Sequence, residues 1–342
     1  MRIRDIWIKI KDIKASHISE EENRERKSLE TIRKGLNVGL KTTWILGKII
    51  FPITLIITIL QYTPVLPWIV KLIEPFMGLL GLSGNAAIPL VLGNFINLYA
   101  AIGAMLSMDL TVKEVFILAI MLSFSHNIIV ESTVAAKVGV KLWIVASVRI
   151  FLAIISAFVI NLVWHGGNEL AKFGMISNHP SETVNGIGEM VWQGIEKASL
   201  GILQLAIIVI PLMIMIQYMK DLHWIDHFSK WMAPVLKILG MKENTSTTLA
   251  AGILFGLAYG AGVMIQSAKE NSVSKKDLYL AFIFLVSCHA VIEDTLIFVP
   301  LGIPVWPLLV IRLTVAIVLT MIVALIWRRI EFIGRKEAAY ES

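Results

Sequence analysis

Two short segments contain most of the residue types that could do chemistry. One reads Ser-His-Asn-Ile-Ile-Val-Glu-Ser over residues 125–132, and the other reads Cys-His-Ala-Val-Ile-Glu-Asp-Thr over residues 288–295. Imidazole, carboxylate and thiolate groups bind divalent transition metals, and a histidine beside a carboxylate can also carry a proton. The candidate substrate-binding residues are therefore His126, Asn127, Glu131, Cys288, His289, Glu293 and Asp294.

The second segment differs from the first at reactive positions. Glu293 stands where the first segment has Val130, and Cys288 stands where it has Ser125. His289 and Glu293 are spaced i, i+4, so we expect them to share one face of a helix. The predicted metal ligands are His126, His289 and Glu293. The spacing alone also fits proton coupling, contact with a polar solute, or structural hydrogen bonding.

Two arginines are placed to pair with the acids of these segments. Arg149 follows Glu131 at the same interval at which Arg312 follows Asp294. If the chain turns over between them, acid and arginine lie at similar depth on neighbouring antiparallel helices. We expect two buried ion pairs, which could be architectural or could act as gates. Other polar residues in apolar surroundings are expected mainly to bond neighbouring helices: Asn94, Asn97, Tyr99, Tyr259 and Gln266.

The elements that carry these residues belong in a membrane. The chain of 342 residues is 56% hydrophobic and only 16% charged, with a mean hydropathy of +0.75. Soluble domains carry about 25% charged residues. This composition excludes a soluble enzyme, a nucleic-acid-binding module and a disordered protein, and it predicts an all-α integral membrane protein.

Ten apolar segments have about the length of a membrane helix, although the second and seventh are short and contain a proline. These segments cover residues 42–62, 65–82, 85–107, 114–138, 141–165, 198–220, 225–240, 245–268, 275–301 and 305–328. The predicted division is an amphipathic N-terminal segment, a first membrane repeat, an external loop, a second repeat and a cytoplasmic tail, at residues 1–41, 42–165, 166–197, 198–328 and 329–342.

The two halves of the chain are related by an internal duplication. At one constant offset, His126 falls on His289, Glu131 on Asp294 and Arg149 on Arg312. Upstream of these positions the offset is slightly shorter, and Pro75 falls on Pro234. Matched histidine, acidic and arginine positions do not belong to the apolar background, so they indicate two structural repeats.

The distribution of charge predicts how the repeats are oriented. Both termini are rich in Lys and Arg, whereas the connecting loop at 166–197 holds four acidic and two basic residues. Basic flanks favour the cytoplasmic side, so both termini are expected to be cytoplasmic and the loop external. Each half then crosses an odd number of times and the repeats are inverted, which is typical of secondary transporters.

Residues 126–132 and 289–295, each after a glycine-rich span, resemble the nucleoside-recognition or Gate domain membrane proteins. That superfamily groups concentrative nucleoside transporters, the membrane part of the FeoB ferrous-iron transporter and the spore maturation proteins. The resemblance covers about residues 65–325 and implies a transporter of a prokaryotic cytoplasmic (inner) membrane with its site between the repeats. This chain lacks the G-protein domain of the FeoB type and the usual length of the nucleoside transporters.

The predicted function is that of a secondary transporter or facilitator, with a preference for a divalent metal cation as substrate. Alternatives are a proton-coupled transporter of a small polar, nucleoside-like solute, a transporter of an anionic or lipid-linked phosphate, and a membrane scaffold subunit. The sequence shows neither a phosphate-cradling loop nor a nucleophile elbow, so we expect no enzyme and no resident cofactor. Expected partners are membrane lipids and a homo-oligomer or membrane partner, without nucleic acid.

Overall fold

The computed structural model describes residues 3–61, 63, 65–173, 186–257 and 273–340. Within these ranges the chain is built from α-helices and short 3-10 helices, with one isolated β-bridge between Thr111 and Leu170. The predicted all-α class is therefore confirmed. The predicted polar residues Tyr259 and Gln266, and part of the loop at 166–197, lie outside the described residues.

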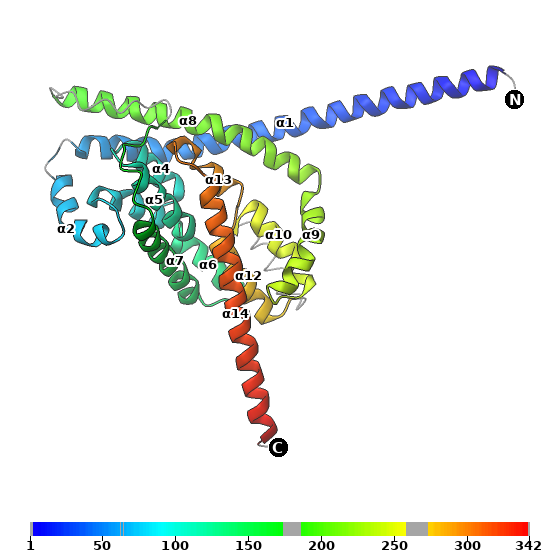
Figure 1. Ribbon diagram of the computed structural model, residues 1–342. Coiled ribbons are helices and arrows are strands. Elements are labelled where there is room, and N and C mark those ends of the chain that lie inside the picture. Colours follow the sequence, from blue (N-terminus) through cyan, green and yellow to red (C-terminus); the bar gives the residue numbers. More distant parts are fainter. Residues whose placement is uncertain (1–2, 62, 64, 174–185, 258–272, 341–342) are drawn as a thin grey trace.

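The first helices of the two halves, α1 (Ile3–Gln61) and α8 (Ile187–Asp221), pack against each other through the C-terminal half of α1, while the N-terminal part of α1 extends away from the other helices (Figure 1). Gly35 lies beside Ile214, whereas Gly194 lies beside Leu55. Residue numbers that rise on one helix as they fall on the other show an antiparallel pair. Because α1 and α8 occupy matching places in the two repeats, their opposite directions agree with the predicted inversion.

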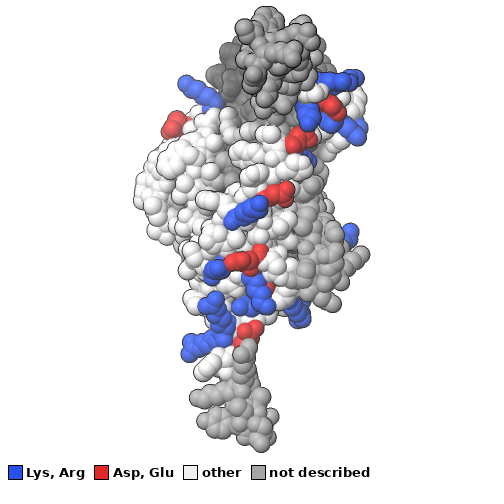
Figure 2. All heavy atoms as spheres, turned by 90° about the vertical axis from the view of Figure 1, so that its right-hand side faces the viewer, with Lys and Arg blue, Asp and Glu red and all other residues white. Residues whose placement is uncertain are grey.

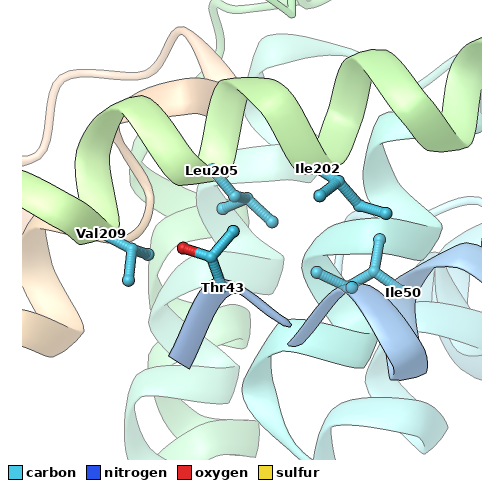
Figure 3. A pocket seen from close by; sticks show the side chains of 6 residues that line it. Thr43, Ile50, Ile202, Leu205 and Val209 are labelled. Carbon is cyan, nitrogen blue, oxygen red and sulfur yellow. The ribbon is translucent and has the colours of Figure 1, made fainter. Parts of the chain in front are cut away.

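A stripe of small residues lets α1 approach α8 closely. Every fourth residue of α1 is small over four turns: Thr31, Gly35, Gly39, Thr43 and Gly47. Small residues at this spacing are a common basis of helix contact in membranes. Figure 3 shows part of this seam, where Thr43 and Ile50 of α1 face Ile202, Leu205 and Val209 of α8 across a small apolar recess.

The short helices repeat along the chain with the predicted offset. Helix α2 (Val65–Leu79) and helix α9 (Trp224–Ile238) each have 15 residues, and their bounds are separated by the same offset as Pro75 and Pro234. Each is followed by a 3-10 helix and a further short helix, which are η1 (Gly84–Ala86) and α3 (Ala87–Phe95) in the first repeat and η2 (Glu243–Thr245) and α10 (Ser246–Phe255) in the second.

The remaining elements carry the predicted site. In the first repeat they are α4 (Leu98–Leu106), α5 (Val112–Ser125), α6 (Ile128–Lys137) and α7 (Leu142–Val163). In the second they are α12 (Lys275–Ser287), α13 (Glu293–Leu296), η3 (Val299–Leu301) and α14 (Trp306–Tyr340). Both α5 and α12 begin with a hydroxyl residue that accepts from the third helical N–H, Thr111 before Glu114 and Ser274 before Asp277.

Among the residues that the structure describes, five helices are long and apolar enough to cross a membrane, or six if the bent pair Ile73–Leu79 and Gly84–Phe95 forms one span. The five candidates are Glu25–Leu60, Val112–Lys137, Leu142–Val163, Gly188–Asp221 and Trp306–Phe332. The predicted count of ten is not confirmed. Apolar runs of spanning length are present in the sequence, but the backbone breaks within several of them, for example between α3 and α4.

Two largely buried helices, α5 and α12, lie at the centre of the described structure. All residues of α5 from Glu114 to Ser125 are buried, and α7 and α14 pack beside α5 and α12 respectively. Large apolar side chains are exposed on the outside, among them Trp143, Phe151, Trp231 and Trp306. On the face in Figure 2, charged side chains form a column beside wide areas free of Lys, Arg, Asp and Glu. Such a surface suits contact with lipid.

Candidate functional site

Two helix breaks place the histidines in the interior. Helices α5 and α12 end just before His126 and His289. Beyond each histidine one residue adopts a left-handed backbone, Asn127 with φ 50° and Ala290 with φ 42°. The N–H of Asn127 donates to the carbonyl of Gly93 at 2.9 Å, and that of Ala290 donates to Gly252 at 3.1 Å. Both breaks are thus held by hydrogen bonds at positions that match between the repeats.

Backbone carbonyls orient both imidazole rings. The Nδ1 atom of His126 lies 2.6 Å from the carbonyl oxygen of Leu122, and Nδ1 of His289 lies 2.8 Å from that of Leu285. Because a carbonyl can only accept, we assign a proton to Nδ1 in both rings. In the neutral ring the lone pair is then on Nε2. This is how metal-binding histidines are usually oriented.

Glu131 lies where the two rings converge. Its Oε1 atom is 3.3 Å from Nε2 of His126 and 3.3 Å from Nε2 of His289. One ligand atom from each of these three residues lies within 4.8 Å of the other two. Both histidines are buried, and the Glu131 side chain is 12% exposed. Lone pairs on two nitrogens facing a carboxylate oxygen repel one another unless a proton or a cation lies between them.

Arg149 fixes the first half of this site. Its Nη1 atom lies 2.7 Å from Oε2 of Glu131, which forms the first predicted ion pair. Its Nε donates to the carbonyl of Phe124 at 2.7 Å, and its Nη2 donates to that of His126 at 2.6 Å. These carbonyls lie at the C-terminal end of α5, where helical partners run out. The fully buried guanidinium therefore has two roles: it caps the broken helix and it positions Glu131.

Arg312 has the same place in the second half. Its Nη2 donates to the carbonyl of His289 at 2.7 Å and to Oδ2 of Asp294 at 3.0 Å, which is the second predicted ion pair. The same Oδ2 lies 3.6 Å from Nε2 of His289. A continuous group thus joins the repeats, here named the central cluster: His126, Glu131, Arg149, His289, Asp294 and Arg312.

Glu293 does not share a helical face with His289, so that prediction is wrong. The backbone leaves the helix after Ser287, and the next helix starts only at Glu293. The Oε1 atom of Glu293 instead accepts from the hydroxyl of Tyr99 at 2.7 Å. Glu131, which was not among the predicted metal ligands, therefore occupies the position beside the two histidines that was expected for Glu293.

The other two predicted residues contribute to the backbone around the cluster. Cys288 is a buried free thiol at the end of α12, and Asn127 forms the left-handed break before α6. Tyr99 was expected only to bond a neighbouring helix. Its contact with Glu293 joins α4 of the first repeat to α13 of the second, and no sequence spacing indicates this contact.

The comparison with protein families bears on both the fold and the site. The model of the Gate family, described as nucleoside recognition, matches residues 43–141 and 202–304. The chain belongs to the Gate family. The starts of the two matched regions are separated by the same offset as Pro75 and Pro234, and their ends by the same offset as His126 and His289. Each region contains one histidine and one acid of the central cluster, whereas Arg149 and Arg312 lie just beyond the ends of the two matched regions.

A membrane protein from Bacillus subtilis is similar to this chain over most of its length. The uncharacterized membrane protein YvoD of Bacillus subtilis (strain 168) is 59% identical over 295 residues, which cover 86% of this chain and 94% of that protein. No solved structure matches the chain. This Gate family protein is therefore similar to a membrane protein whose name indicates no substrate.

Proposed function

We propose that this Gate protein is a membrane transporter or facilitator that binds a divalent transition metal cation at His126, Glu131 and His289. The observation that carries the proposal is the convergence of two Nε2 atoms on Oε1 of Glu131, each at 3.3 Å. A divalent ion bound about 2.0–2.1 Å from each atom, at tetrahedral angles, separates neighbouring ligands by about 3.3 Å. The fourth position would be left for water or for the route of the ion.

The surroundings of the three atoms favour a metal over a shared proton. A proton between an imidazolium and a carboxylate normally draws the heavy atoms to about 2.7–2.9 Å, which is shorter than the distances observed. The Nδ1 hydrogen bonds to Leu122 and Leu285 keep both Nε2 atoms directed at the site. Arg149 holds the other oxygen of Glu131, so Oε1 remains directed at the histidines.

Transport is supported by the way in which the site is divided between the repeats. His126 and Glu131 come from the first repeat, and His289 comes from the second. A movement of one repeat against the other separates these ligands and opens the site. We place the protein in the cytoplasmic (inner) membrane of a prokaryote, with both Lys- and Arg-rich termini in the cytoplasm and the 166–197 loop outside.

A second candidate is a proton-coupled transporter of a nucleoside-like solute. The description of the matched family, nucleoside recognition, favours it. In that case the polar groups of the central cluster, with Glu293 and Tyr99, bind the solute, and one imidazole carries the proton. The two candidates predict different ligands for the same residues, so one binding experiment separates them.

The test is a titration of the purified protein in detergent with Co²⁺, whose visible spectrum reports nitrogen and oxygen ligands. Wild type is expected to bind about one Co²⁺ per chain, and Glu131→Gln is expected to lose this binding because the amide cannot supply an anionic ligand. Glu243→Gln, which removes an exposed carboxylate paired with Lys237, is the control and should bind normally.

Transport is measured by metal uptake into proteoliposomes with the same three proteins. Uptake by wild type and by Glu243→Gln, but not by Glu131→Gln, supports the proposal. Equal Co²⁺ binding by Glu131→Gln and wild type would contradict the metal site. A rise in melting temperature with nucleosides and not with metals would support the second candidate instead.

A further inference from the structure

The two arginines of the central cluster match in sequence but not in their partners. All three nitrogens of Arg149 have an oxygen within 2.7 Å, two in hydrogen bonds and Nη1 in the ion pair. Arg312 places both of its contacts on one nitrogen, Nη2, which bonds His289 and Asp294. Its Nε and Nη1 atoms are buried without a partner among the residues that the structure describes. Three N–H hydrogens of a fully buried guanidinium are therefore unused.

The difference follows from the backbone at the end of α12. Arg149 bonds the carbonyl of Phe124 through Nε, and the matching carbonyl in the second repeat is that of Ser287. After Ser287 the chain departs from the helix, with Cys288 at φ −154° and ψ 85°. The carbonyl of His289 is still within reach of Arg312, but Nε has lost its partner. A buried donor without a partner costs about 1–3 kcal/mol, more beside a charge.

The charges of the central cluster show what kind of group is missing. The positive charges of Arg149 and Arg312 balance the negative charges of Glu131 and Asp294. A divalent cation at the two histidines would leave an excess of two positive charges in a buried site. Glu293, which accepts from Tyr99, can offset at most one of them. A buried excess of charge is costly, and an anion beside Arg312 lowers that cost.

We propose that Nε and Nη1 of Arg312 bind a small oxyanion, through a carboxylate or phosphate oxygen, and that this anion binds together with the cation. The inference rests on the proposed function, because it makes the substrate an ion pair or a metal complex rather than a bare cation. The guanidinium suits this ligand because it presents N–H donors in fixed directions toward carboxylate or phosphate oxygens. The neighbouring Asp294 accepts from Nη2 of Arg312, and the same oxygen lies 3.6 Å from Nε2 of His289, so Asp294 lies between the anion site and the cation site.

The test measures how each ion changes the binding of the other. Mn²⁺ is titrated into metal-free protein in detergent, and free Mn²⁺ is read from its electron paramagnetic resonance signal. The titration is repeated with acetate, with phosphate and with chloride alone at equal ionic strength. Acetate or phosphate is expected to tighten Mn²⁺ binding by about fivefold or more, the lower end of usual coupling between sites. The two anions distinguish a carboxylate ligand from a phosphate ligand.

Two matched variants locate the effect. Arg312→Lys keeps the positive charge but removes the unused N–H groups, so the anion should no longer change the Mn²⁺ affinity. Arg149→Lys disturbs the position of Glu131 and weakens Mn²⁺ binding, but the ratio of affinities with and without anion should persist. If Arg312→Lys fails to fold, the wild-type titrations alone decide, since an anion that changes the affinity by less than twofold contradicts the proposal.

Failure of this inference can be told apart from failure of the proposed function. The melting temperature of metal-free wild type is measured with acetate and with phosphate. A rise without any Mn²⁺ binding retains the anion site and overturns the cation site. Mn²⁺ binding that is indifferent to both anions, with no rise in melting temperature, retains the cation site and overturns the anion site.

Discussion

The two halves of the central cluster begin from matching residues and reach different structures. In the first repeat the break after α5 is short, and α6 then continues for 10 residues. In the second repeat the break after α12 is longer, and α13 has only 4 residues. Glu131 reaches both histidines from α6, whereas Asp294 reaches only His289 from the start of α13.

Prolines explain much of this difference. Pro300 and Pro304 stand where the first repeat has Lys137 and Lys141. Proline removes a backbone N–H and disfavours a helical residue before it, so α13 gives way to the 3-10 helix η3. The comparison shows that a duplicated sequence can produce one half-site in which every arginine nitrogen lies beside an oxygen, and another in which two arginine nitrogens lack a partner among the described residues. The predictions below test that contrast.

The largest effect on the stability of the protein is expected when the arginines of the central cluster are replaced. Arg149→Leu leaves Oε2 of Glu131 and two backbone carbonyls without partners, and loss of one member of a buried ion pair costs about 3–5 kcal/mol. Arg312→Leu leaves the Asp294 carboxylate and the His289 carbonyl without their arginine donor. The other two nitrogens that it removes have no partner among the described residues. Thermal unfolding in detergent should therefore show Arg149→Leu as the less stable variant. The reverse order would contradict the contrast between the two halves.

The two histidines should contribute equally to metal binding, even though the two repeats around them differ in structure. Loss of an outer group that orients a metal ligand weakens metal binding roughly 10- to 100-fold. His126→Gln and His289→Gln remove a ligand itself, so each is expected to weaken Co²⁺ binding by more than this. Asp294→Asn should fall within that lower range, because its carboxylate accepts from Arg312 and lies 3.6 Å from Nε2 of His289, outside the three ligand atoms. A loss for Asp294→Asn larger than that for either histidine variant would place the metal in the second half-site.

The seam between α1 and α8 is unequal too, with small residues on α1 and isoleucines on α8. A Cβ added at Gly35 would lie 2.6 Å from Cα of Ile214, so Gly35→Ala forces the backbones apart. We expect a loss of about 1–3 kcal/mol in stability. At Gly47 the nearest atom would be 3.6 Å away, so Gly47→Ala should be neutral or stabilising by up to about 1 kcal/mol. Equal melting temperatures for the two variants would contradict this close approach.

The smallest effect is expected at the contact between Tyr99 of the first repeat and Glu293 of the second. Tyr99→Phe removes the hydroxyl that donates to the partly buried Glu293, and the loss of one such hydrogen bond costs about 1 kcal/mol. Co²⁺ affinity should change by less than about threefold, because Tyr99 contacts none of the three ligands. The control is Tyr218→Phe, whose hydroxyl bonds Ser28 on the α1–α8 seam. A large loss of Co²⁺ binding in Tyr99→Phe alone would make Glu293 a ligand after all.

The sequence by itself determined the membrane class, the duplication and the two ion pairs. Composition is enough for the first, because too few charged residues remain to cover a soluble domain. The ion pairs followed from an equal interval between acid and arginine in both repeats, with a glycine inside each interval. Gly139 and Gly302 both adopt positive φ at that turn, 92° and 69°, which is a backbone conformation that glycine favours.

Only the tertiary structure decided which acid joins the histidines and which arginine keeps free donors. A spacing of i, i+4 predicts a shared face only if the helix continues, and α12 ends before His289. Glu131 and His289 belong to different repeats, so their contact depends on how the inverted repeats pack rather than on any local pattern. The unequal partners of Arg149 and Arg312 depend on the course of the backbone after Ser287, because hydrogen-bond geometry is lost with small changes in carbonyl position.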